Sequence, residues 1–332
     1  MLRIATYHTE LSRKGPGLLL RDILRGGDAQ VEAVARVIAA ADADILLLQG
    51  VDYDAELRTL SALAEVLAEA GVAYPHLFAL RPNRGLQTGL DLDGDGRRGE
   101  PEDAQGYGWY QGEGGMALLS RYPVEAAGVR DFTAMPWRDM PGALLPEAVA
   151  DAQGLRLSTT GHWVVPVEVG GTRLTLLAFH ATPPVFDDEN DLNGRRNHDE
   201  IAFWRHYLDG AFGPPPEGRF VLLGVANLDP VDGEGRKEAI AALLADPRLR
   251  DPAPRRAGPV AERHGHAGAA VLDTADWAGP VPGALRVSYL LPSADLSVTA
   301  SGVLWPSEGA PLAEVVDAAS RHRLIWVDLA LE

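Results

Sequence analysis

One short stretch, residues 220–230, constrains the fold of this chain more than any other. Its sequence is Phe-Val-Leu-Leu-Gly-Val-Ala-Asn-Leu-Asp-Pro. The apolar run predicts a buried strand that ends at Gly224, and the polar turn from Asn227 to Pro230 follows at its carboxyl end. Other apolar runs also end in His, Asn or Asp, so we expect the strand ends to form the rim of a single pocket.

The amino-terminal part of the chain alternates between strand and helix patterns. Residues 2–7 and 45–48 form the alternating or apolar runs that are typical of strands. Asp28 is a favourable helix N-cap before a run with helical spacing, and a second helical run ends before Gly71. Residues 15–27 have no clear pattern, so we expect a loop there. This β-α-β-α order predicts the α/β fold class.

The rest of the chain contains further strands separated by irregular stretches. Residues 80–114 are rich in Gly, Asp and Arg without periodicity, and an insertion of this length is usually functional or held by a ligand. We expect strands over 115–120, 163–169, 173–179, 220–223, 286–291, 297–304 and 324–329, and helices at about 201–208 and 236–245. The charged residues 195–200 predict a solvated helix start. Since no repeat or linker interrupts the sequence, we expect one domain over residues 1–332.

Composition and charge limit the functions open to this chain. With 332 residues, 46% of them hydrophobic, it has enough apolar surface for a sizeable core. Its formal charge of −17 and the lack of a basic stripe disfavour binding to duplex nucleic acid. The absence of Cys excludes disulfides, thiolate metal sites and cysteine nucleophiles. No signal peptide precedes the first strand and no apolar stretch has the length of a membrane span, so we expect a soluble, cytoplasmic protein.

Several segments, taken together and in order, resemble motifs of the endonuclease/exonuclease/phosphatase superfamily. They are residues 2–7, 44–49, 115–123, 222–227, 286–292 and 320–324, together with His180. The segment Gly-Met-Ala-Leu-Leu-Ser-Arg-Tyr-Pro at 115–123 fits the family pattern G-x-A-(I/L)-L-S-R-(Y/F)-P closely. The resemblance spans nearly the whole chain. It implies a four-layer α/β/β/α sandwich of two packed mixed β-sheets in one domain.

The resemblance also implies hydrolysis of a phosphoester with a divalent metal ion, which carboxylates hold while Asp and His position the attacking water. Three catalytic positions of the family are kept here, as His180, Asn227 and His322. Five others are replaced. The family's Asn, Glu and three Asp positions are occupied, in chain order, by His8, Gly50, Val225, Ser288 and Arg321.

These replacements favour a catalytically degenerate member of the family. The loss of four acids, one of them to Arg, makes the pocket more positive by about five charge units, so that it would attract an anion rather than a dication. We therefore expect a small anionic or phosphorylated ligand near His8 and Arg321. One alternative is an active phosphoesterase in which Asp52, Asp54 or Asp229 rebuilds a site for Mg²⁺ or Mn²⁺. Another is a structural or partner-binding protein whose pocket is a relic.

Residues 91–102 match the calcium-loop pattern D-x-D-x-D-G-x₅-E without a gap. Asp91, Asp93 and Asp95 supply oxygens at alternate positions, Gly96 allows a sharp turn, and Glu102 falls at the bidentate position. No helical pattern flanks the loop, so it differs from an EF-hand with two helices. The pattern predicts a structural Ca²⁺ site that orders the insertion at 80–114, and the alternative is an acidic surface loop without an ion.

Overall fold

The first of two β-sheets contains strands from both ends of the chain. In the computed structural model, β1 (Leu2–Leu11) and β2 (Ile45–Val51) are parallel neighbours. The sheet continues on one side with β13 (Ile325–Ala330) and β12 (Ser297–Val303), and on the other with β4 (Gly115–Ser120) and β3 (His76–Phe78). The structure describes residues 1–331 except 150, 151, 153, 187–189, 259, 261–264, 278 and 280.

The second sheet comes from the middle of the chain and has the strand order β11-β8-β7-β6-β5. Its strands are β5 (Arg130–Asp131), β6 (Gly161–Val169), β7 (Thr172–His180), β8 (Phe220–Val225) and β11 (Ser288–Pro292). The pair β7–β8 is parallel and the other pairs are antiparallel, so this sheet is mixed, like the first. A separate two-stranded ribbon consists of β9 (Ala275–Asp276) and β10 (Ala284–Leu285).

Apolar side chains at alternate strand positions meet between the two sheets. Ile4 and Leu47 of the first sheet and Leu176 and Leu223 of the second are fully buried in this layer. The opposite faces of the same strands are apolar as well, which is the pattern of sheets that are covered on both sides.

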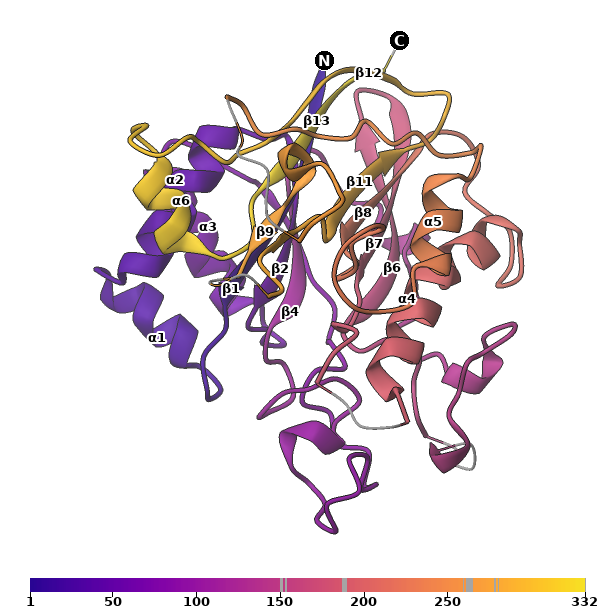
Figure 1. Cartoon of the computed structure of the whole chain (residues 1–332). Helices are drawn as coiled ribbons and strands as arrows, with labels where there is room; N and C mark the ends of the chain where they lie inside the picture. The colour runs from indigo at the N-terminus through magenta and orange to yellow at the C-terminus, as the bar shows by residue number, and fades with distance from the viewer. Residues whose placement is uncertain are drawn as a thin grey trace.

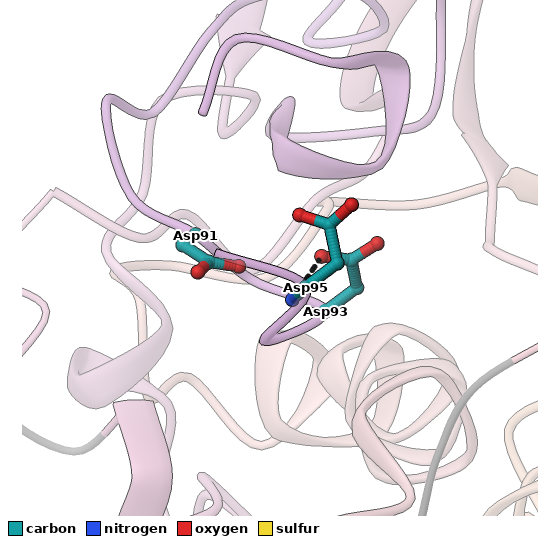
Figure 2. Close-up of side chains that lie close together, drawn as sticks. All are labelled: Asp91, Asp93 and Asp95. Atoms are coloured by element: carbon teal, nitrogen blue, oxygen red, sulfur yellow. Dashed lines mark hydrogen bonds between the residues drawn. The ribbon is translucent and has the colours of Figure 1, made fainter. Parts of the chain in front are cut away.

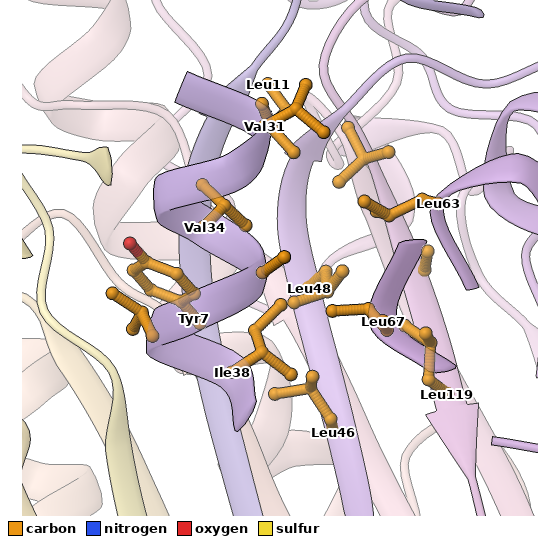
Figure 3. Packing of buried hydrophobic residues seen from close by; sticks show 14 of the residues in the cluster. Tyr7, Leu11, Val31, Val34, Ile38, Leu46, Leu48, Leu63, Leu67 and Leu119 are labelled. Atoms are coloured by element: carbon orange, nitrogen blue, oxygen red, sulfur yellow. The ribbon is translucent and has the colours of Figure 1, made fainter. Parts of the chain in front are cut away.

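Helices cover the two outer faces, which gives four layers (Figure 1). The helices α1 (Leu18–Arg25), α2 (Ala29–Ala41), α3 (Arg58–Glu69) and α6 (Ala313–Ala319) pack on the first sheet. The helices α4 (Leu192–Leu208) and α5 (Glu238–Leu244) pack on the second. Figure 3 shows Val34 and Ile38 of α2 beside Tyr7 and Leu46 of the sheet. This α/β/β/α sandwich confirms the expected fold class.

The helix boundaries both confirm and correct the expectations from sequence. The Asp28 side chain caps α2 by accepting hydrogen bonds of 3.0 Å from two backbone N–H groups in the first turn. Residues 15–27 are not a loop, because α1 lies there, and α6 was not expected at all. The insertion at 80–114 is irregular, with one short 3₁₀ turn at Pro101–Asp103. No helix in the described ranges is both long and apolar enough to cross a membrane.

We expect Leu47→Ala to lower the free energy of unfolding by about 2–5 kcal/mol, because it removes a fully buried side chain from the layer between the sheets. Leu24→Ala is the matched control, since Leu24 of α1 is 64% exposed, and it should change stability by less than about 0.5 kcal/mol. Urea denaturation measures both variants. Equal losses in the two variants would contradict the assignment of the core.

Candidate functional site

At one end of the space between the sheets, apolar side chains give way to polar ones. Thr6 of β1 and Gln49 of β2 are both buried, and the side-chain amide of Gln49 donates a hydrogen bond of 2.7 Å to the Thr6 hydroxyl. His8 lies two residues beyond Thr6 in β1. Because side chains alternate along a strand, the side chains of Thr6 and His8 lie on the same face of the sheet. The alternation therefore places His8 between the sheets rather than under the helices.

Three histidines meet at this point: His8 in β1, His180 at the end of β7, and His322 just before β13. The ring centroid of His8 lies 4.9 Å from that of His180, edge-on, and 4.4 Å from that of His322, stacked. The Nδ1 atoms of all three are buried without a hydrogen-bond partner. Because buried polar atoms are nearly always paired, this cluster indicates a binding site.

Backbone contacts fix the positions of the three rings. His180 lies opposite Val225 in the register between β7 and β8. The Ser320 hydroxyl donates a hydrogen bond of 2.8 Å to the carbonyl of His8 and accepts one of 3.1 Å from the backbone N–H of His322. Ser320 thus joins the end of β1 to the segment that carries His322.

A half-buried arginine from the insertion, Arg84, stands beside the histidines. Its Nε atom is buried and has no hydrogen-bond partner. Gly114, with a φ of 58°, allows this close approach, because a Cβ there would lie 3.2 Å from Nε. Burial lowers the pKa of Arg84, and the nearby Glu113 and Asp52 oppose that shift. A guanidinium stays protonated in proteins, so Arg84 brings a full positive charge to the cluster.

Arg84 and the three histidines line a cavity of about 1180 Å³. Asn227, just beyond β8, lines it too. Its backbone is left-handed, with a φ of 52°, and its side-chain amide donates a hydrogen bond of 2.8 Å to the carbonyl of Ala181. The three retained family positions therefore lie in one place, as the sequence predicts. We call the surface formed by His8, Arg84, His180, Asn227 and His322 the cavity floor.

The histidines of the floor are neutral at pH 7. Burial lowers the pKa of His8 and His180 well below the ordinary value of 6.5, and their cationic neighbours, including Arg84, lower it further. Burial also lowers the pKa of His322 to about 4, although Glu10 opposes this shift. An anion placed among these rings would favour their protonated forms.

Arg321 lines the cavity as expected, but its charge is already paired with Glu10. Its Nε atom donates a hydrogen bond of 2.8 Å to one carboxylate oxygen, and its backbone N–H donates one of 2.8 Å to the other. Burial raises the pKa of Glu10, but the hydrogen bonds from Arg321 outweigh this and lower it. The cavity thus contains an acid that the charge count from sequence omitted, and its Arg321 is less available to an anion than Arg84.

The backbone leaves no room for the glutamate that the family has at Gly50. Gly50 has a φ of 71°, and a Cβ there would lie 2.8 Å from Cε1 of His8 and 3.0 Å from the backbone nitrogen of Glu10. The imidazole of His8 therefore occupies the space beside this position. Val225 and Ser288, at two other lost acid positions, lie opposite each other on β8 and β11 and are buried. They bring no negative charge to the site.

The three acids considered as relocated metal ligands hold backbone turns instead. Asp52 accepts two hydrogen bonds of 3.0 Å from backbone N–H groups, and Asp54 accepts two from the start of α3. Asp229 accepts three, between 2.7 and 2.8 Å. Of the three, Asp229 alone lines the cavity. Each carboxylate thus has a structural role that accounts for its position.

Residues 195–200 are not the solvated helix start expected from their charges. Four of them are buried in α4: Arg196, Asn197, Asp199 and Glu200. The Glu200 carboxylate accepts hydrogen bonds of 2.6 Å from the N–H of Thr159 and 2.7 Å from that of Thr182, and both threonines line the cavity. Burial raises the pKa of Glu200 to about 7, although Arg196 and these hydrogen bonds oppose the shift. The helix therefore braces two loops of the cavity from behind.

The proposed calcium loop lies in the insertion, and none of its four acids lines the cavity. One carboxylate oxygen from each of Asp91, Asp93 and Asp95 lies within 4.8 Å of the others, the one such cluster of acidic or histidine side chains among the described residues. Figure 2 shows these carboxylates, and the Asp93 carboxylate accepts a hydrogen bond of 3.2 Å from the N–H of Asp95. Glu102, the expected bidentate ligand, is not part of the cluster. Calcium binding stays a prediction.

We expect Ca²⁺ to raise the thermal unfolding temperature more than Mg²⁺ does, because the flexible coordination of Ca²⁺ suits clustered carboxylates on a loop. Asp93→Ala should abolish the effect, and Glu102→Ala should weaken it less. Thermal unfolding in EDTA, in Ca²⁺ and in Mg²⁺ measures this. An unfolding temperature that Ca²⁺ leaves unchanged would show that the loop is acidic without holding an ion.

Three residues that shape the site were not predicted from sequence. Arg84 lies in an aperiodic insertion, so no local pattern distinguishes it. Glu10 acts through Arg321, a partner 311 residues away. Glu200 belongs to a charge run that resembles a solvated surface. One sequence signal could have identified Glu10. It lies near the end of the first strand, and the other site residues likewise lie at or near strand ends.

Comparison with known proteins agrees with this architecture. Residues 23–322 match the model of a family described as the Endonuclease/Exonuclease/phosphatase family. The structure of an endonuclease/exonuclease/phosphatase from Beutenbergia cavernae DSM 12333 is similar over 99% of this chain and 71% of that one, with 20% identity and a TM-score of 0.59. A family protein from Leptotrichia buccalis C-1013-b is similar over 100% of both chains, with 16% identity and a TM-score of 0.57.

A third similar structure is sphingomyelinase C from Streptomyces griseocarneus, with 19% identity over 98% of both chains and a TM-score of 0.51. No curated protein sequence matches this chain. At these identities the likeness to solved structures concerns the fold alone.

Proposed function

Because the chain belongs to the endonuclease/exonuclease/phosphatase family, we propose that its cavity binds a small anionic or phosphorylated ligand and does not hydrolyse it. The observation that carries this proposal is the set of unpaired nitrogens at the floor, Nε of Arg84 and Nδ1 of the three histidines. Guanidinium and imidazolium N–H groups form strong, charge-assisted hydrogen bonds with phosphoryl oxygens. The ligand would therefore satisfy atoms that the protein leaves unpaired.

The described residues do not fit the divalent cation that hydrolysis in this family requires. Mg²⁺ and Mn²⁺ need hard oxygen ligands, above all carboxylates. The acids that line the cavity are Glu10, Asp229, Asp232 and Glu234. Glu10 pairs with Arg321, Asp229 and Asp232 accept backbone N–H groups, and Glu234 is exposed. The charge of Arg84 would also repel a dication from the floor. The described lining is therefore unsuited to metal-dependent hydrolysis.

We expect sulfate to bind the metal-free protein in the cavity, and Arg84→Gln to weaken that binding roughly tenfold or more, the usual loss when a charged hydrogen-bond partner is removed. Arg321→Gln combined with Glu10→Gln is the matched control. The double change removes a guanidinium from the same cavity together with the carboxylate that neutralises it, so the effect should be smaller. Titration calorimetry measures the affinities, and His180→Gln provides a second floor variant in case Arg84→Gln does not fold. Unchanged affinity in both floor variants would favour the relic-pocket alternative.

The same titration should depend on pH. Burial lowers the pKa of His8 and His180 in the free protein, and a bound anion raises it, so binding takes up protons. The affinity should therefore increase as the pH falls from about 8 to about 6. Sulfate is the suitable probe, because its own charge does not change in this range. An affinity that is constant with pH would mean that the histidines do not contact the anion.

The alternative function, a phosphoesterase with Mg²⁺ or Mn²⁺, predicts turnover. We expect none above the uncatalysed rate with p-nitrophenyl phosphate or bis(p-nitrophenyl) phosphate in either metal, since no unpaired carboxylate in the described cavity lining stands at the floor. An absorbance assay measures product. Turnover that His180→Ala abolishes would establish the enzymatic alternative and refute the non-hydrolytic proposal.

A further inference from the structure

The floor is only part of the cavity, and the rest of the lining is largely apolar. Beyond the floor, two walls contribute proline, aliphatic and aromatic side chains. They are Pro183, Pro184, Val185, Trp277, Leu285 and Val287. An enclosed surface of this kind binds the apolar part of a ligand, while a few polar groups fix its orientation.

One wall is built on the β9–β10 ribbon. Leu285 and Val287, with Ala275, form a small apolar cluster that is separate from the three large ones, and Trp277 packs against it. Trp277 stands edge-on to His322, with 5.5 Å between ring centroids. The apolar wall thus begins directly beside the floor.

Backbone pairing ties this wall to the floor. Ala275 pairs with His322 as an isolated bridge, and the N–H of Arg323 donates a hydrogen bond of 2.7 Å to the carbonyl of Thr274. The Thr274 hydroxyl in turn accepts the N–H of Val287 at 2.9 Å. These backbone contacts therefore hold the apolar wall at a defined distance and orientation from the floor.

The second wall consists of Pro183, Pro184 and Val185, which follow β7 shortly after the floor histidine His180.

A turn that contains Gly233 and Gly235 passes close to both walls. A Cβ at Gly235 would lie 2.8 Å from the Cβ of Pro184, and one at Gly233 would lie 3.0 Å from Cδ1 of Leu285. Both glycines have positive φ angles, 100° and 70°. The absence of side chains at these two points lets the turn approach the apolar groups.

The apolar character continues to the mouth of the cavity. Among the described residues, seven large hydrophobic side chains are exposed, and three of them line this cavity: Tyr107, Phe186 and Val281. Phe186 is 91% exposed and Val281 is 81% exposed. They come from distant segments of the chain, and the fold brings all three to the lining of one cavity. Grouped exposed apolar side chains mark binding surfaces.

Resting on the proposed function, we propose that the ligand is an amphiphilic phosphate ester, with its phosphoryl group on the cavity floor and an apolar alkyl or aryl group against the wall of Trp277, Leu285 and Val287. Asp229 and Asp232, which also line the cavity, accept hydrogen bonds from backbone N–H groups, whereas Trp277, Leu285 and Val287 offer apolar side chains to the ligand. Such a ligand comes either from a membrane lipid or from a soluble metabolite.

A homologous series tests this proposal. Ethyl, butyl and hexyl phosphate are titrated calorimetrically into the metal-free protein beside inorganic phosphate. Each methylene that enters the cavity should tighten binding roughly fourfold, the value of its transfer from water. The heat-capacity change of binding should also become more negative along the series.

Two variants and one control locate the effect. Trp277→Ala and Val281→Ser should lower the affinity for hexyl phosphate more than the affinity for inorganic phosphate, so that the dependence on chain length becomes flatter. Val281 is exposed, so Val281→Ser should not disturb the core. It therefore tests the proposal even if Trp277→Ala does not fold. Val231→Ser is the matched control, because Val231 is 56% exposed but does not line the cavity. It should keep the full dependence on chain length.

The outcomes separate this proposal from the one on which it rests. A flat series with inorganic phosphate still bound overturns the amphiphilic ligand and leaves the anion site intact. No binding of inorganic phosphate or of any ester overturns the anion site itself. Equal slopes in Val281→Ser, Trp277→Ala and the wild type also overturn the proposal. Binding to phosphatidylcholine vesicles that contain phosphatidic acid, displaced by hexyl phosphate, supports the lipid source, and a preference for the soluble esters alone supports the metabolite.

Discussion

The contact between the two sheets is the constraint on which the site depends. Most strands of the two sheets direct alternate side chains into one shared apolar layer, and polar groups are tolerated only where that layer ends. Thr6 and Gln49 satisfy each other at this boundary, and the histidines stand just beyond it. Core packing and strand register therefore position His8 and His180, which belong to β1 and β7. Arg84, by contrast, reaches the floor from the insertion.

The strand pattern was sufficient to predict the α/β class and a pocket at the strand ends, because long buried strands carry a strong periodic signal. The sandwich of two sheets, and the grouping of His180, Asn227 and His322, were predicted from the resemblance to the family motifs. The prediction failed where structure is decided by distant contacts. The helix α1 is eight residues long and begins after a glycine without a side-chain cap, so it is shorter than the stretch over which a helical pattern is usually recognised. Arg84 is placed by the packing of an aperiodic insertion, in which even a Cβ on Gly85 would lie 1.9 Å from the carbonyl oxygen of Tyr110.

The electrostatics of the site differ from those of the protein as a whole. A formal charge of −17 repels anions at long range, whereas the floor presents the guanidinium of Arg84 and three imidazoles whose pKa burial lowers. Neutral rings avoid the large cost of burying several like charges beside Arg84. A Cβ at position 50 would lie 2.8 Å from Cε1 of His8, so the imidazole takes up the space that a side chain at position 50 would enter. The residues at positions 8 and 50 are therefore sterically coupled.

The pairing of β1 with β13 has a consequence for the order of folding. Their side chains meet through Arg3 and Asp328, which are 325 residues apart, and the segment that carries His322 and Arg321 directly precedes β13. The second sheet, by contrast, is complete once residue 292 has been made. On a ribosome, the middle of the chain can reach a nearly native arrangement while the first sheet still lacks the strand between β1 and β12. Contacts of such long range close late, so the cavity comes into existence only when the last strand docks, and until then the chain exposes the edge of β1.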